Sequence, residues 1–563
     1  MAQIIPFGAY QPDMADINAQ YTQSIMNVKP QADGYGPWSA HVPFSGALPA
    51  RCRGYFYGRN GDALMVFAGT ETKLYQLNNT TLEWIDVSLG ASTYAALSSD
   101  AQWQFAQFNN IVLATHKNVV LQKFDVTADS AFANLAGSPP QSAYISTINR
   151  FVVLSGLLSL PYRVHWSGLD AITTWTPGTG LCDFQDIPDG GAVRGVAGGE
   201  FGIIIQDTSL RRMVFSPGSD VIFQIDRIAK DTGGLAPYSI VNAGDHIFLL
   251  SPRGFIRVDG SGQIAPIGKE RVDRTFLREY DSANLQLVIG ASDPSSNQVI
   301  WVYKSMDGGQ SGLFDRILTY DWVLDKWSPA QYTGEYIAAL ARPGLTLEAL
   351  DAIAPGVLTI TGAANNGAGL IRITVASTSS LATGNIRTIT QVAGTTEANA
   401  TWTITVIDAT HFDLQGSTFT NAYASGGIVG GFLDQLSFSL DTVSASTLAQ
   451  ISMIDANHKL GFFDGDTIEA TMETAEQTQH NRRVNINGLR PATDASGCYA
   501  SLATRDRLPD TATYGDESIM DADGNCPVLE EGRYLRAKLR IPAASTWTYA
   551  TGITPDVLPA GEF

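Results

Sequence analysis

The feature that most constrains the fold of this chain is a hydrophobic pattern that recurs about every fifty residues. Short apolar runs, each entered through a small polar turn, begin at Leu64, Ile111, Phe151, Phe201, Ile247 and Val299. Their spacing of roughly 40 to 52 residues is typical of β-propeller blades. Most runs are followed by a turn and a second strand-like segment, such as KLYQL or YRVHWSG, with no helical pattern between them. The chain therefore reads as a series of antiparallel hairpins.

These hairpins predict an all-β fold, a β-propeller of about six blades over residues 51–355, because radial repetition buries both faces of every sheet. The composition agrees, since 54 glycines, 20 tyrosines and 10 tryptophans accompany only 16% charged residues. A further hairpin is expected from Leu318 to Ser328. No WD or kelch signature marks the repeats, so a set of unrelated β-sandwiches with similar spacing is the alternative.

The composition changes near Gly356 and changes back near Gly430. Residues 356–430 hold 15 threonines and five Asp, Glu, Lys or Arg residues, with the alternation of two-faced antiparallel strands. We interpret this segment as an inserted antiparallel β domain. Residues 431–563 resume strand-like patterns and are expected to supply the closing blade or blades and the C-terminal strands.

The first 50 residues show neither period and are rich in Pro, Gly, Asn and Tyr, so they are expected to form an extended N-terminal arm. Its large aromatic residues, Phe7, Tyr10, Tyr35 and Trp38, are candidate subunit-interface residues, because aromatics on a glycine-rich extension cannot build a core alone. The alternative is that they fold back onto their own propeller.

Catalytic and metal-binding signatures are mostly absent from the sequence. There is no P-loop, no G-x-S-x-G and no H-E-x-x-H. The seven histidines, His41, His116, His165, His246, His411, His458 and His480, are far apart, and each is expected to be structural. The stretch from Ser305 to Ser311 resembles a sialidase Asp-box turn but lacks its tryptophan. The stretch from Asp521 to Asn525 departs from an EF-hand at the required glycine and glutamate. We expect a protein that is not an enzyme and needs no cofactor or metal.

Charge and cysteine content narrow the function further. The net charge of −19 gives no general attraction to nucleic acid, and the basic clusters, such as Arg211–Arg212 and Arg482–Arg483, mostly have acidic neighbours. Ordinary DNA binding is therefore disfavoured. The cysteines Cys52, Cys182, Cys498 and Cys526 form neither a dense framework nor a CxxC pair, which favours folding in a reducing compartment. No apolar run is long enough to span a membrane.

Several segments resemble one family. The arm contains Ile5-Pro6-Phe7, Tyr10-Gln11-Pro12-Asp13, Asn27-Val28-Lys29-Pro30 and Gly34-Tyr35-Gly36-Pro37. In these segments, and in Arg163 to Pro177, Asp186 to Val196, His246 to Gly260 and Arg533 to Ile553, the chain resembles the tail nozzle, or packaged-DNA-stabilisation (tail hub), proteins of short-tailed bacteriophages. The insert from Ile371 to Gly427 is similar to a small β module that recurs in phage tail and baseplate proteins.

The resemblance implies a virion protein of the phage tail, made in the host cytoplasm. It implies a homo-oligomeric ring, commonly a hexamer, below the head–tail adaptor, with propellers around a central DNA channel. Such a nozzle retains packaged DNA, conducts it out during ejection and anchors tail fibres, spikes or a needle. An acidic wall suits double-stranded DNA that must pass without sequence-specific contacts and without sticking. The alternatives are a receptor-binding or baseplate protein, and a propeller glycosidase or lyase acting on host-surface polysaccharide.

Overall fold

The computed structural model describes residues 4–61, 63–342, 358–379, 381–430, 449–478 and 482–559 of this chain. The contacts divide the chain into two compact units. One comprises Met1–Leu77, Glu83–Pro343 and Ser446–Phe563, and the other comprises Asn78–Leu82 and Gly344–Ala445. None of the helices in the described ranges has the length and apolar character that a bilayer crossing requires.

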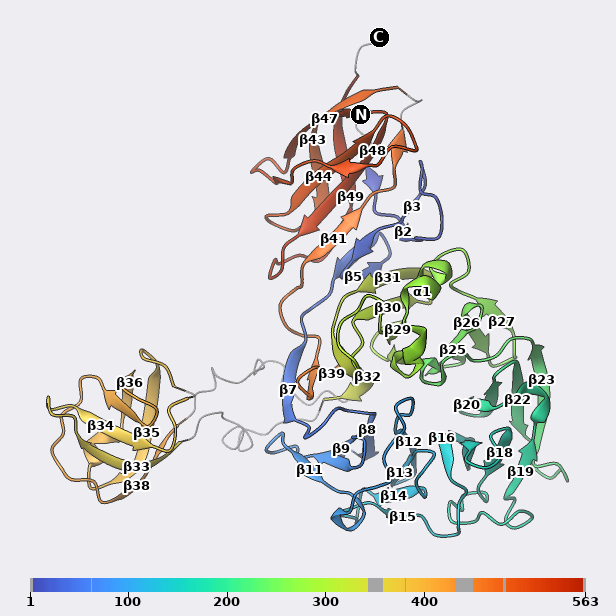
Figure 1. Ribbon diagram of the computed structural model, residues 1–563, viewed down its shortest axis with the longest axis horizontal. Helices are drawn as coiled ribbons and strands as arrows, with labels where there is room; N and C mark the ends of the chain where they lie inside the picture. The colour runs from blue at the N-terminus through green and yellow to red at the C-terminus, as the bar shows by residue number, and fades with distance from the viewer. Residues whose placement is uncertain are drawn as a thin grey trace. The chain divides into compact units, whose positions relative to one another are not determined.

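Seven four-stranded antiparallel sheets make up most of the first unit (Figure 1). Six are continuous in sequence. The first three consist of β8 (Tyr55–Asn60), β9 (Ala63–Gly69), β10 (Leu74–Leu77) and β11 (Trp84–Asp86); β12 (Gln104–Phe108), β13 (Ile111–Thr115), β14 (Gln122–Asp125) and β15 (Ala133–Asn134); and β16 (Ser142–Ile148), β17 (Phe151–Leu157), β18 (Arg163–Trp166) and β19 (Asp183–Asp186). The next three consist of β20 (Val193–Gly198), β21 (Phe201–Gln206), β22 (Ser209–Phe215) and β23 (Phe223–Lys230); β24 (Val241–Ala243), β25 (His246–Ser251), β26 (Gly254–Asp259) and β27 (Ile264–Pro266); and β28 (Ile289–Asp293), β29 (Gln298–Tyr303), β30 (Arg316–Asp321) and β31 (Lys326–Ala330). The seventh joins β32 (Gly334–Ala341), β39 (Ala449–Asp455), β40 (Lys459–Phe462) and β7 (Val42–Ala47).

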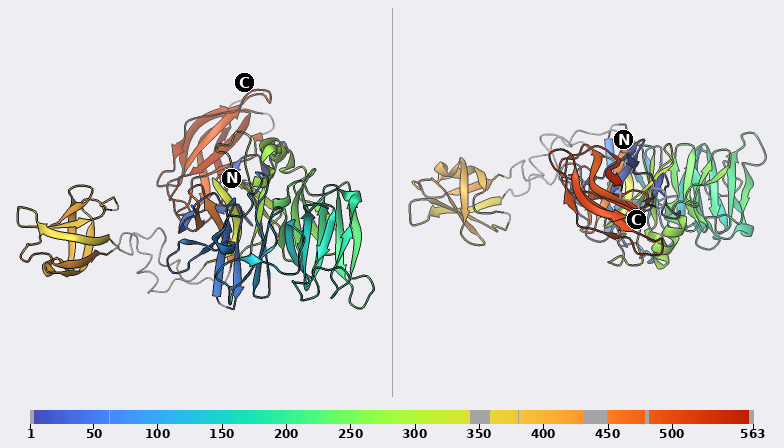
Figure 2. Two further views of the ribbon diagram at one scale, coloured as in Figure 1. Left: turned by 60° about the horizontal axis from the view of Figure 1, so that its bottom comes forward. Right: turned by 90° about the horizontal axis from the view of Figure 1, so that it is seen from above.

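The sheets form a closed ring. The first strand of each sheet contacts the first strand of the next, from β8 through β12, β16, β20, β24, β28 and β32, and β32 contacts β8. Buried apolar side chains fill the space between consecutive sheets; between the first two, for example, Phe67 packs on Phe124 with ring centroids 4.9 Å apart. Figure 1 shows the sheets following one another around this ring, and Figure 2 shows the same chain from two other directions. The fold is therefore a β-propeller, as the sequence predicted.

The hairpins follow from local turn chemistry. Phe108 pairs with Ile111 and Ile148 pairs with Phe151, which leaves two-residue turns that begin at Asn109 and Asn149. Both asparagines have a φ of +53°. Asparagine tolerates this left-handed conformation better than most residues, and such turns match the twist of the flanking strands.

The six apolar runs that reveal the period all lie on the second strand of a sheet. A second strand has a neighbouring strand on each side and a neighbouring sheet on each face. All seven residues of β17 are accordingly buried, and so are all six of β29. Continuous burial makes these strands uniformly apolar instead of alternating. The seventh sheet has no run of this kind, because its strands come from three distant segments.

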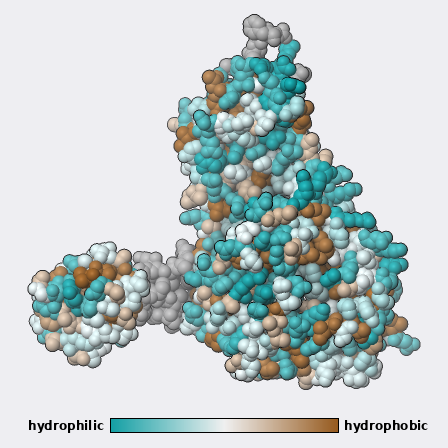
Figure 3. All heavy atoms as spheres, viewed as in Figure 1, coloured by the Kyte–Doolittle hydropathy of each residue, from teal (hydrophilic) through white to brown (hydrophobic). Residues whose placement is uncertain are grey.

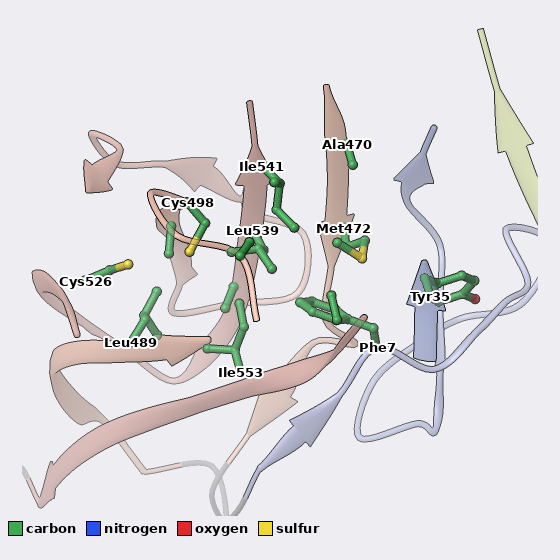
Figure 4. Close-up of a cluster of buried hydrophobic side chains, with 14 of the residues drawn as sticks. Phe7, Tyr35, Ala470, Met472, Leu489, Cys498, Cys526, Leu539, Ile541 and Ile553 are labelled. Atoms are coloured by element: carbon green, nitrogen blue, oxygen red, sulfur yellow. The ribbon is translucent and has the colours of Figure 1, made fainter. Parts of the chain in front are cut away.

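The two ends of the chain build a separate pair of sheets within the first unit. One sheet contains β1 (Ile5–Pro6), β5 (Val28–Gln31), β6 (Gly34–Pro37), β43 (Val484–Thr493), β47 (Cys526–Gly532) and β49 (Ala550–Pro559). The other contains β4 (Ile25–Met26), β41 (Ala470–Glu473), β42 (Gln477–Thr478), β44 (Tyr499–Arg505), β45 (Thr513–Tyr514), β46 (Ser518–Ile519) and β48 (Tyr534–Ile541). We call this pair the C-terminal sheets. They enclose one apolar core, part of which Figure 4 shows.

A few short elements complete the first unit. Strands β2 (Ala9–Tyr10) and β3 (Tyr21–Thr22) pair in parallel within the arm. The helix α1 (Asp273–Glu279) and the 3-10 turns η1 (Leu89–Ala91), η2 (Pro188–Gly190), η3 (Pro237–Ser239) and η4 (Ser282–Leu287) connect the propeller strands.

The second unit holds a closed six-stranded barrel in the order β33-β34-β37-β36-β35-β38. Its elements are β33 (Leu358–Asn365), β34 (Ile371–Val375), β35 (Ile386–Ala393), η5 (Thr396–Ala398), β36 (Thr401–Val406), β37 (His411–Leu414) and β38 (Ser425–Val429). In sequence they lie between β32 and β39, within the segment 356–430 that the composition set apart. Ile371, Ile373, Phe412 and Leu414 are fully buried in the barrel core.

Candidate functional site

The N-terminal arm connects the propeller to the C-terminal sheets. Its strand β1 pairs with β49, and its strand β4 pairs with β41. The β5–β6 hairpin joins the same sheet as β49 through the pairing of Tyr35 with Ala550. Strands β2, β4 and β5 also contact β31, the last strand of the sixth propeller sheet. The arm is therefore an integral part of the fold.

The four aromatic residues predicted at a subunit interface lie in this connection. Phe7 and Tyr35 belong to the core of the C-terminal sheets, with 2% and 0% of their surface exposed. Trp38, 1% exposed, packs on Phe463 and lies under the ammonium group of Lys29. Tyr10 is half-buried between this core and the sixth propeller sheet.

The structure thus has these side chains packed on their own chain, with Phe7 and Tyr35 in the C-terminal sheets and not on the propeller that the alternative named. Three of them contact the C-terminal sheets or the seventh propeller sheet, because the strands that bury them come from residues 449–559. A subunit contact through Phe7, Tyr35 or Trp38 stays a prediction that would require the arm to leave these positions.

Asp13 fastens the arm to the propeller at the start of α1. Its carboxylate accepts hydrogen bonds from the backbone amides of Arg274 and Thr275 at 2.7 and 2.8 Å, and from the Thr275 hydroxyl at 2.7 Å. The residue before α1 is Val272, which has no side-chain cap to offer. A carboxylate from 260 positions away therefore performs the usual work of an N-cap. The sequence pattern predicted no helix at residues 273–279, so it gave no signal for this contact.

Asn27 makes the second connection. Its backbone amide donates to Pro329 O at 3.0 Å, and its side-chain oxygen accepts from the Gln331 amide at 2.8 Å, both in the propeller. Its side-chain nitrogen donates to Glu469 O beside the C-terminal sheets at 2.8 Å. The φ of +61° is unusual for a residue with a side chain and lets one asparagine serve both partners.

Two charged pairs lie at the second C-terminal sheet. The Arg505 guanidinium binds the Glu476 carboxylate through two hydrogen bonds of 2.7 and 2.5 Å, and Glu476 is only 1% exposed. Arg536 donates to Asp16 of the arm at 2.9 Å. Burial raises the pKa of Asp16, and the nearby Arg536 opposes that rise. The Arg536–Asp16 pair holds the arm in place through largely buried charge, which is costly to break.

The axis of the propeller is bridged at one end. The amide of Gln102, before the second sheet, donates to the hydroxyl of Tyr238, before the fifth, at 2.9 Å. The Gln102 side chain donates to Gln286 O, before the sixth sheet, at 3.0 Å. Tyr238 also contacts Tyr144 of the third sheet, with ring centroids 6.3 Å apart. Because these sheets are not neighbours, the contacts must cross the axis.

The barrel of the second unit carries little charge. It has two arginines, Arg372 and Arg387, against Glu397, Asp408 and Asp413. Arg372 and Asp413 form a bidentate pair at 2.7 and 3.0 Å. The barrel therefore accounts for only one negative charge of the net −19.

The histidines and acidic turns make structural contacts. His458 bonds the buried Glu335 carboxylate at 2.6 Å, and His165 lies 3.7 Å from the Cys182 sulfur. His480 falls outside the described residues. The turn that resembles an Asp-box follows β29, and its Ser305 binds the Asp315 carboxylate through backbone and hydroxyl. Asp521 accepts backbone amides within its own turn. Within the described ranges, no three His, Cys, Asp or Glu side chains gather as a metal site requires.

Comparison with known proteins gives likeness of fold only. No family model matches the chain, and no curated protein matches it. A structure of U3-55K is 8% identical at a TM-score of 0.35, covering 70% of this chain and 100% of that one. BamB from Moraxella catarrhalis is 10% identical at a TM-score of 0.29, covering 54% and 94%. A mitotic checkpoint complex chain is 9% identical at 0.31, covering 55% and 90%. Scores this low carry no argument about function, and the propeller assignment rests on the closed ring of sheets.

Proposed function

We propose that this chain is a structural protein of a bacteriophage tail, a nozzle subunit that forms a homo-oligomeric ring, commonly a hexamer, below the head–tail adaptor. In this role the ring retains packaged DNA, conducts it out during ejection and anchors fibres, spikes or a needle. In this proposal each of the seven four-stranded sheets is one propeller blade, whereas the sequence predicted about six blades. The proposal starts from the sequence resemblance of the arm, the blades and the insert.

The observation that carries the proposal is the way the chain's additions are attached to the propeller. Both chain ends combine into the C-terminal sheets, and Asp13 and Asn27 fasten the arm to the propeller. The barrel interrupts the seventh sheet in sequence and forms its own compact unit. A closed propeller with two added modules suits a protein that attaches other proteins to one another.

The contacts across the propeller axis support a nozzle in which DNA does not pass through the individual propellers. A DNA duplex cannot follow an axis crossed by the bonds of Gln102 and Tyr238, so DNA would pass between copies, through the lumen of the ring. A wall formed by the acidic first unit would repel phosphates and let the duplex slide. The nearly uncharged barrel has no such role and suits contact with a protein or glycan.

The experiment is to measure the mass of the assembled particle formed by the purified chain, with and without its adaptor. Six copies of the 60.3-kDa chain weigh about 360 kDa. A ring of that mass, resolved with a central opening, supports a nozzle. A trimer would favour the receptor-binding alternative, and a monomer that cleaves host polysaccharide would favour the glycosidase or lyase.

A further inference from the structure

Two cysteines meet in the core of the C-terminal sheets. Cys498 directly precedes β44, and Cys526 begins β47. Both are fully buried and carry free thiols. Figure 4 shows them on adjacent parts of the same core. The other two cysteines, Cys52 and Cys182, lie in the propeller, each beside different neighbours.

The backbone brings these two positions together. Strands β44 and β47 belong to different sheets but lie in contact. At their far ends, the Arg533 amide donates to Arg505 O at 3.3 Å. At their near ends, the Met520 amide donates to Cys498 O at 3.0 Å, and Asp521 closes the short turn that leads to Cys526. The contact at both ends holds the two cysteines on facing segments.

The sulfur atoms share one environment. The Met520 thioether lies 3.6 Å from the Cys498 sulfur. The neighbouring Cys526 thiol lowers the pKa of Cys498, although burial acts in the opposite direction. The neighbouring Cys498 sulfur and burial raise the pKa of Cys526. Cys498 is therefore the thiol that ionises first, and a thiolate is the form that an oxidant attacks.

We propose that Cys498 and Cys526 are a latent disulfide pair, reduced when the chain folds and joined when it meets a peroxide. The Cys498 thiolate attacks hydrogen peroxide, forming a sulfenic acid and releasing hydroxide. The Cys526 sulfur then attacks the sulfenic sulfur, forming the S–S bond, and its proton leaves with the hydroxyl group as water. Two thiols and one peroxide thus give one disulfide and two waters.

The bond would join the two C-terminal sheets at a place where no strand ladder connects them. A disulfide that closes a loop of this length lowers the population of the opened sheets by about 30- to 1,000-fold. The inference does not depend on the nozzle function, since it concerns only the core chemistry of these sheets.

The test treats the folded wild-type chain with hydrogen peroxide, then denatures it and counts thiols. We expect the count to fall from four to two, with a peptide map joining the segments that contain Cys498 and Cys526. The variant Cys498→Ser should keep three thiols before and after treatment. If that variant fails to fold, the peptide map of the oxidised wild-type chain is sufficient to test the proposal. Four surviving thiols, a link through Cys52 or Cys182, or oxygen added to Met520 without a disulfide would overturn the proposal.

Discussion

Replacing Phe7 by alanine tests whether the arm is a working part of the C-terminal core. Phe7 is 2% exposed and packs in that core with Met472, Leu539 and Ile553, so the substitution removes a nearly complete aromatic burial. A buried phenylalanine hides about 150–250 Å², worth roughly 4–6 kcal/mol at 25 cal/mol per Å². Measured large-to-small substitutions cost about 3–5 kcal/mol. We therefore expect a loss of about 4 kcal/mol in the free energy of unfolding of these sheets.

Hydrogen exchange followed by mass spectrometry measures this loss strand by strand. A loss of about 4 kcal/mol speeds exchange through opening by roughly a thousandfold. We expect that acceleration in β43 and β49, with β17 and β29 of the propeller unchanged as internal controls. Phe7→Leu is the matched variant, expected to cost less than about 1.5 kcal/mol. Wild-type exchange rates in β43 and β49 of the Phe7→Ala chain would refute an arm built into this core.

Three further predictions follow from single contacts. Arg505→Met should destabilise the C-terminal sheets by about 3–5 kcal/mol in urea unfolding, because it leaves the buried Glu476 carboxylate without its partner. Adding Glu476→Leu should recover most of this loss, and a double variant as unstable as Arg505→Met would contradict the importance of the pair. Burial raises the pKa of Asp273 from 3.8 to about 6, because the folded state favours the protonated carboxyl. The stability that this carboxyl contributes is therefore complete below pH 3.8 and is lost as the pH rises through 6. Asp273→Asn should therefore gain thermal stability over wild type between pH 4 and 7, and a constant difference would contradict this. Residues 356–430 expressed alone should unfold cooperatively by circular dichroism, since the barrel has its own core, and a featureless melt would count against an independent domain.

The repeat could be predicted because each run is a fully buried second strand. Burial on both faces makes six segments similarly apolar, from Leu64 to Val299. Because each sheet contributes one such strand, the segments recur at a spacing of one sheet. The seventh sheet could not be predicted this way. It combines β7, β32, β39 and β40 from three distant segments, so no period along the chain contains it.

The burial of the N-terminal arm could be predicted only in part from the sequence. Its composition marks it as an element that lacks a core of its own, and this holds, since Phe7 and Tyr35 are buried by other parts of the chain. Which residues bury them depends on strands some 430 to 550 positions away. The contacts of Asp13 and Asn27 are also non-local, since their partners lie some 260 to 440 positions away, whereas Arg505 and Glu476 are 29 positions apart.

The most direct test of the nozzle proposal is an electron cryomicroscopy map of the virion that carries this chain, with its propeller fitted into the density. The proposal predicts a ring of copies coaxial with the portal, with the DNA path between propellers and acidic surface of the first unit toward the lumen. Density for the chain only in peripheral trimers, or in no coaxial ring, would contradict it.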